Sequence, residues 1–208
     1  LQSKWGSSVA LICNILGAYV LYFIARLIYV FSNWSYFSEG FSGTTIGQWI
    51  KGSLLFDTTA IVYTHIPYVL LMLFPLWMKE QPGYQKLCKW VFVGVNSVAL
   101  AINLADAVYF PFTLRRTTMS VFQEFSHEGN LFSIVGKEVL HHPGVFLFGI
   151  VLIFLLWLLY VEPRAYRPEL RPRWKYYLVQ VVALGIFVPL CIGGMRGGFT
   201  TAVRPITL

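Results

Sequence analysis

The sequence predicts an all-α membrane protein: a five-helix transmembrane bundle with short amphipathic interfacial helices on its outer face. Of its 208 residues, 57% are hydrophobic and only 12% are charged, whereas about 25% of residues are charged in a typical soluble domain. Five apolar stretches each come close to the ~20 residues that a helix needs to cross a ~30 Å hydrocarbon core. The stretches cover about 8–31, 58–77, 90–110, 144–161 and 176–193.

The basic residues predict the orientation of these helices. Half of the 16 basic residues fall in the loops after the second and fourth stretches, and basic loops stay in the cytoplasm. The N-terminus is therefore expected in the cytoplasm and the C-terminus on the opposite side. The same rule explains the net charge of +7 without a nucleic-acid partner, and leaves the phospholipid bilayer with its headgroups as the expected partner. The loop residues are Lys79, Lys86, Lys89, Arg164, Arg167, Arg171, Arg173 and Lys175.

The segment 111–143 is too polar to span a membrane, yet it carries helical patterns. Apolar side chains recur on one helical face in about 117–126 and again in about 130–142, where Asn130 is a candidate N-cap. Both patterns are typical of helices that lie in the membrane interface. A similar interfacial element is expected around Ile46–Leu55, before the second span.

Charged residues inside the apolar stretches are the first functional candidates, because such residues are costly in a bilayer. Arg26 and Asp106 lie at similar depths near the outer ends of their helices, and Asp57 opens the second stretch. Arg26 is expected to pair with Asp106 or, failing that, with Asp57. Either the pair only fixes helix packing, or the cluster floors an outward-facing site for a lipid headgroup. Asn103 shares the inward arc of its helix with Asp106, where hydrogen bonds between helices are the simplest expectation.

Other polar motifs carry weaker signals. Arg115 and Arg116, just outside the third stretch, could bind a lipid phosphate or could simply snorkel to the interface. Adjacent His141 and His142 point apart, so no metal site is expected. No catalytic constellation occurs, so no catalytic residue is assigned to the chain. The glycine-rich segment 193–198 lacks the features of a phosphate loop and begins a linker over 194–208 that follows the membrane domain 1–193.

Six short phrases together resemble one protein family. They are Phe56–Tyr63, Asn103–Phe110, Arg115–Thr118, Glu124–Leu131, Arg196–Phe199 and Arg204–Ile206. The set is similar to the N-terminal transmembrane domain of lipoteichoic-acid-synthase-like phosphoglycerol transferases of the Bacteroidota type, within the alkaline phosphatase and sulfatase superfamily.

The resemblance implies a bacterial inner-membrane protein whose five helices precede a periplasmic catalytic domain that uses Mn or Mg. That domain would move a phosphoglycerol-type headgroup from a phospholipid to an envelope acceptor. The chain itself would be the inert membrane anchor, with its own C-terminal catalytic domain as partner. Arg115, Arg116, Arg196 and Arg204 are the expected phosphate contacts. The alternative is a non-enzymatic accessory subunit of an envelope membrane complex.

Overall fold

The computed structural model describes residues 2–3, 6–38, 42–76, 78–79, 81–114, 131–163 and 173–196. Within these ranges the protein is built from seven helices, and its only strands are two that are two residues long each. Four of the helices are long and apolar enough to cross a membrane, so the chain is a multi-pass membrane protein. These are α1 (Ser7–Ser32), α3 (Gly43–Leu73), α4 (Pro82–Thr113) and α8 (Arg173–Arg196).

Three shorter helices complete the described chain. The one-turn α2 (Trp34–Phe37) follows α1, and α6 (Leu131–His141) leads into α7 (Pro143–Leu159). Pro143 starts α7 at a position where proline costs no hydrogen bond. The 17 residues of α7 are apolar, but α7 is shorter than the four long helices, which have 24 residues or more.

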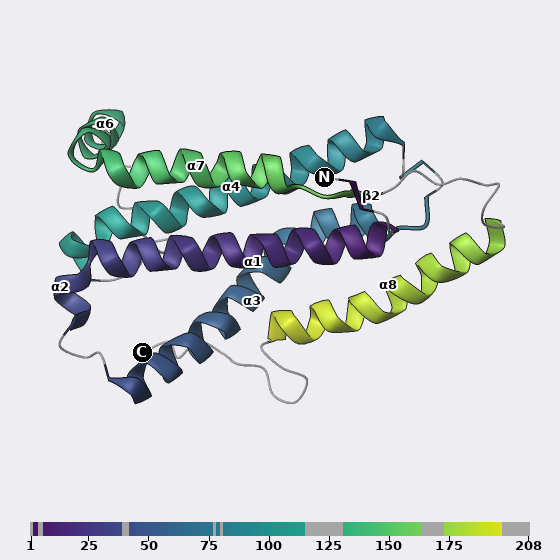
Figure 1. Cartoon of the computed structure of the whole chain (residues 1–208), viewed down its shortest axis with the longest axis horizontal. Helices are drawn as coiled ribbons and strands as arrows, with labels where there is room; N and C mark the ends of the chain where they lie inside the picture. The colour runs from purple at the N-terminus through teal and green to yellow at the C-terminus, as the bar shows by residue number, and fades with distance from the viewer. Residues whose placement is uncertain are drawn as a thin grey trace.

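α1, α4 and α7 lie roughly parallel to one another in Figure 1, and α3 crosses beneath them. α8 packs chiefly against α3 and stands apart from the other helices. We name the two ends of the bundle for reference. The proximal end holds the start of α1 and the end of α7, and the distal end holds the end of α1 and the start of α7.

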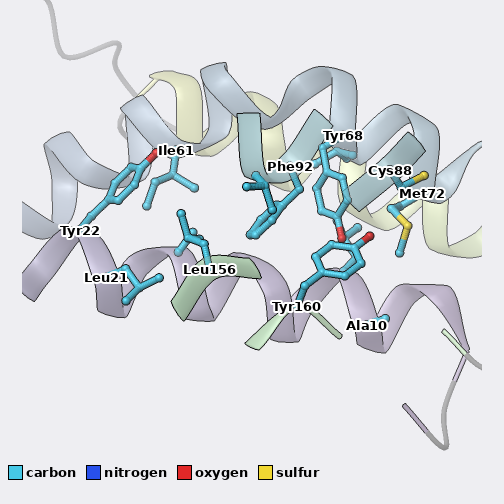
Figure 2. Close-up of a cluster of buried hydrophobic side chains, with 14 of the residues drawn as sticks. Ala10, Leu21, Tyr22, Ile61, Tyr68, Met72, Cys88, Phe92, Leu156 and Tyr160 are labelled. Atoms are coloured by element: carbon cyan, nitrogen blue, oxygen red, sulfur yellow. The ribbon is translucent and has the colours of Figure 1, made fainter. Parts of the chain in front are cut away.

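The core is a continuous apolar cluster contributed by α1, α3, α4 and α7, with one residue of α8 (Figure 2). α4 and α7 pack closely at Gly149, where an added Cβ would lie 2.8 Å from the Leu104 Cδ1 atom. Small residues at helix interfaces are typical of membrane bundles, because they let two backbones pack closely. Fully buried members of the cluster include Leu11, Ile61, Tyr68, Met72, Phe92 and Leu100.

The predicted boundary of the second span is wrong at both ends. The helix begins at Gly43, not near 58, so Ile46–Leu55 forms its first turns and is not a separate interfacial element. The Ser42 side chain caps this start by accepting from the Thr45 N–H at 3.3 Å. The helix stops at Leu73, not 77, because Pro75 disfavours a helical conformation at Phe74.

The other expected elements fall closer to the structure. α4 begins at Pro82, eight residues before the expected 90, so Lys86 and Lys89 lie on the helix and not in a loop. α6 covers most of the predicted helix 130–142. The predicted helix 117–126 lies outside the described residues, as does the predicted linker beyond Arg196.

No pattern in the sequence predicts the short parallel pair of strands at the proximal end. β1 (Gln2–Ser3) pairs with β2 (Glu162–Pro163), and this contact holds the start of the chain beside the segment that leaves α7. In Figure 1 the pair lies next to the beginning of α1. The backbone after α7 is therefore held by the protein at the point where it is no longer helical.

Candidate functional site

The Arg26–Asp57 ion pair joins α1 to α3. The Nη2 atom of Arg26 donates to the Asp57 Oδ1 atom, so the structure shows the second of the two partners that the sequence offered. Both side chains are largely buried, at 15% and 16% exposed. Asp57 lies in the middle of α3, not at a helix start. Its pairing with Arg26 lowers the cost of a charge inside a membrane-spanning helix.

One hydrogen-bond donor of this pair has no partner among the described residues: the Arg26 Nε atom is buried without a hydrogen bond. The hydroxyl of Tyr22 is buried nearby, close to the Thr64 side chain. Tyr22 precedes Arg26 by one turn on α1 and is 5% exposed. Figure 2 shows its ring reaching across to α3, with the hydroxyl beside Ile61. Sequence reasoning missed Tyr22, because a tyrosine in an apolar stretch resembles ordinary core.

Asp106 is also buried, at 3% exposed, but it lies on α4, where it takes part in an interaction of its own. Asn103, one turn earlier, donates from Nδ2 to the Ala99 carbonyl of the same helix at 2.9 Å. One residue after Asp106, the Ala107 carbonyl accepts from Asn33 Nδ2 at 2.8 Å. The distal ends of α1 and α4 are thus joined by polar contacts.

Of the four arginines expected to contact phosphate, the structure describes one. Arg196 is exposed and is the last residue of α8. The turn before it packs on α3, where the Thr59 hydroxyl donates to the Gly194 carbonyl at 3.2 Å. An added Cβ at Gly194 would lie 3.0 Å from Val62 Cγ2, so the helices touch closely here. Arg115, Arg116 and Arg204 lie outside the described residues.

A second polar group sits deeper in the bundle and links α3 to α4. His65 is fully buried, and its Nδ1 lies 2.7 Å from the Ile61 carbonyl while its Nε2 lies 2.8 Å from Asn96 Nδ2. Because a carbonyl can only accept, Nδ1 carries the proton and Nε2 accepts from the Asn96 amide. This neutral arrangement joins α3 to α4 and leaves the imidazole engaged on both sides.

Asn14 connects three parts of the bundle near the proximal end. Its Nδ2 donates to the Tyr68 hydroxyl at 2.7 Å and to the Val161 carbonyl at 2.9 Å, while its Oδ1 accepts from the Val161 N–H at 2.8 Å. Val161 belongs to the non-helical backbone that follows α7. Such backbone is tolerated at membrane depth only where the protein satisfies its polar groups. Asn14 does so, although nothing in the sequence pairs it with Val161.

Lys79 is also buried, with no exposed surface. Its Nζ donates to the Met72 carbonyl at 3.0 Å and to Gln180 Oε1 on α8. Met72 lies in the last turn of α3, where carbonyls lack helical partners, so the ammonium group caps that helix and attaches α8. From the sequence, Lys79 is predicted only as a basic residue of a cytoplasmic loop. Its burial could not be predicted, because it depends on how α8 packs.

The described residues contain no group of three or more His, Cys, Asp or Glu side chains that could hold a metal ion. Cys13 is exposed, Cys88 buried and Cys191 half-buried, and all three are free thiols. Among the described polar residues, the Arg26 guanidinium keeps a hydrogen-bond donor, Nε, available beside a fixed ion pair.

Searches against protein-family models, curated proteins and solved structures find no match to this chain. The level of identity that the observations support is therefore a multi-pass helical membrane protein with four candidate spans.

Proposed function

We propose that this chain is the membrane domain of a sulfatase-fold transferase that moves a phosphoglycerol-type headgroup from a phospholipid to an envelope acceptor. The observation that carries the proposal is the position of the Arg26–Asp57 pair. Asp57 belongs to Phe56–Tyr63, one of the phrases that resemble the transferase family, and an ionised pair within a span is a functional candidate by default. The domain would hold its catalytic partner domain beside a two-dimensional pool of lipid substrate, which raises the effective concentration.

The proposal requires five passes, and the packing of α7 supports the fifth. At 1.5 Å per residue its 17 residues extend about 25 Å, at the short end of the range for spanning helices. α7 runs beside α4, which is itself a candidate span (Figure 1). Near the proximal end Lys89 of α4 lies 4.3 Å from the ring centroid of Trp157, and Trp90 packs edge-on against the same ring at 5.0 Å. Tryptophan and lysine together are typical of a membrane interface.

One of the family-like phrases contacts the chain just before another of them begins. Thr59 of Phe56–Tyr63 contacts Gly194, two residues before the Arg196–Phe199 phrase begins. The contact ties the last turn of α8 to the part of α3 that holds Asp57. In the proposed enzyme this junction would fix where the chain leaves the bundle toward the catalytic domain.

The proposed orientation puts the distal end on the periplasmic face of a bacterial inner membrane. An aromatic cluster at that end supports a membrane interface there. The Phe110 ring centroid of α4 lies 5.3 Å from that of Tyr29 and 5.4 Å from that of Phe37. Manganese or magnesium would belong to the catalytic domain, and no step of the chemistry is assigned to residues of this chain.

Diacylglycerol release tests the proposal. The full-length protein is purified and incubated with phosphatidylglycerol and Mn²⁺, and diacylglycerol is quantified. We expect release that depends on both the protein and the metal ion. A reading frame that closes directly after Leu208, or full-length protein that releases no diacylglycerol with either Mn²⁺ or Mg²⁺, would contradict the transferase and favour the accessory-subunit alternative.

A further inference from the structure

We infer that the proximal end carries a surface site for one anionic phospholipid of the leaflet at that end, with Lys86 and Lys89 of α4 binding its phosphate beside the Trp90–Trp157 pair. We call these four residues the proximal lipid site. The inference goes beyond the proposed function, because the proposed transferase would act at the distal end, in the opposite leaflet.

The four side chains lie together where α4 borders α7. Lys89 Nζ lies 4.3 Å from the ring centroid of Trp157 on α7, and Trp90 packs edge-on against the same ring at 5.0 Å. Lys86 precedes Lys89 by three residues, so the two lysines share one face of α4. The first turns of α4, which hold Lys86, extend beyond the end of α7 (Figure 1). Two ammonium groups on one helix face can therefore reach a single phosphate.

Both ammonium groups are available to an anion. Lys86 is exposed and Lys89 is half-buried, and neither forms an ion pair with a carboxylate of the described residues. The attraction between a cation and the Trp157 ring positions Lys89 without neutralising its charge. Trp90 is 62% exposed, so its indole N–H can donate to a headgroup oxygen. Because these groups lie on the surface, a headgroup can contact them without entering the bundle.

The spacing along α4 places the two lysines at headgroup level. Phe110 belongs to the distal aromatic cluster, which marks one membrane interface. Trp90 lies 20 residues before Phe110 on the same helix, which corresponds to about 30 Å, the thickness of the hydrocarbon core. Lys86 lies about 6 Å farther out, within the headgroup layer that adds roughly 5–8 Å on each side. The phosphates of the proximal leaflet are therefore expected beside Lys86 and Lys89.

The surface next to these groups suits acyl chains. Ile150 and Phe154 precede Trp157 by about two turns and one turn on the same side of α7, and both are exposed. They continue from the Trp90–Trp157 pair toward the middle of the bilayer. Basic residues at the end of a spanning helix attract anionic headgroups, and the apolar surface beside them would be covered by a phospholipid but not by a soluble phosphate ester.

Lipid-dependent stabilisation of the purified protein in a neutral detergent tests the inference. The probe is phosphatidylserine, an anionic lipid whose headgroup is not phosphoglycerol, so the proposed donor lipid is left out of the assay. Melting temperature is measured against increasing phosphatidylserine, phosphatidylcholine with the same acyl chains, or glycerol phosphate, and native mass spectrometry counts the bound lipids. We expect one bound phosphatidylserine and a saturable rise in Tm with that lipid alone. Equal stabilisation by phosphatidylcholine or by glycerol phosphate would overturn the inference, because the ligand would then not be an anionic lipid.

Single substitutions of lysine locate the site. Lys86→Gln and Lys89→Gln should each weaken phosphatidylserine binding about fivefold, the contribution of one basic residue beside an anionic membrane surface. Lys89→Arg keeps both the charge and the contact with the Trp157 ring, so it should bind as the wild type does. Lys175→Gln is the matched control and should also leave the affinity unchanged. Lys175 is exposed at the proximal end and lies 5.4 Å from the ring centroid of Trp174, but it belongs to α8, which stands apart from α4 and α7.

Wild-type affinity in both Lys86→Gln and Lys89→Gln would overturn the inference. An equal loss in Lys175→Gln would overturn it as well, because the lipid would then be attracted by the basic residues of the proximal end in general and not by one site. Because the assay requires no catalysis, its failure would leave the transferase proposal standing. Conversely, absence of diacylglycerol release in the full-length protein would leave the proximal lipid site standing.

Discussion

Single polar residues, more than the apolar ones, decide how this bundle is joined. Asn14 illustrates this, because its one amide satisfies both backbone groups of Val161 and the Tyr68 hydroxyl. Asn14→Ala should destabilise the protein by about 2–6 kcal/mol, since two backbone groups each lose a partner at roughly 1–3 kcal/mol. Tyr68→Phe removes only one of the three bonds and should cost about 1 kcal/mol. Unfolding in detergent measures both, and equal losses would contradict the role given to the Val161 backbone.

The charged residues of the candidate site could be predicted from the sequence, but their pairing and their polar neighbours could not. Arg26 and Asp57 stand out in any reading of the sequence, because charges are rare in apolar stretches. Which carboxylate pairs with Arg26 depends on where α3 begins, and the expected start near 58 placed Asp57 at a helix end. Asn14 could not be identified, since its importance comes from Val161, which is distant in the sequence. Spacing along one helix carries no information about such groups.

At the scale of helices, close packing between α4 and α7 depends on Gly149. Its Cβ position lies 2.8 Å from Leu104 Cδ1, so Gly149→Ala forces the end of the Leu104 side chain to move and should cost about 1 kcal/mol, the low end for overpacking. Gly185 on α8 has nothing within 4 Å of the same position. Gly185→Ala should therefore be neutral or stabilise by up to about 1 kcal/mol through helix propensity. Melting temperatures in one detergent compare the two, and a Gly149→Ala variant as stable as Gly185→Ala would refute the close contact.

Helix existence followed from hydropathy, whereas helix ends followed from local chemistry. Each of the five apolar stretches of the sequence forms most of a helix in the structure. The extension of α3 back to Gly43 depends on the Ser42 cap, and its end depends on Pro75. Hydropathy could not reveal either boundary, because the first turns of α3 contain Thr44, Thr45, Gln48 and Lys51. These polar turns carry α3 beyond the ~30 Å that a bilayer core requires, since 31 residues extend about 46 Å.

For the whole molecule, everything about topology turns on whether α7 crosses the bilayer. If it does, α6 and the start of α8 face opposite sides of the membrane. If it does not, they face the same side and the number of passes is even. Lys137 on α6 and Lys175 on α8 are both exposed, and they lie on either side of α7 in the sequence. They are therefore suitable positions for an accessibility test.

Single cysteines at these two positions should react from opposite sides. In a background with Cys13, Cys88 and Cys191 replaced by alanine, Lys137→Cys should be labelled by a membrane-impermeant maleimide in intact spheroplasts. Lys175→Cys should be labelled only after the membrane is opened, because the basic segment before it favours the cytoplasm. Labelling of both from outside, or of neither, would mean that α7 does not cross. The distal ion pair could then no longer be assigned to the same face as the end of α8, and the five-pass proposal would fail with it.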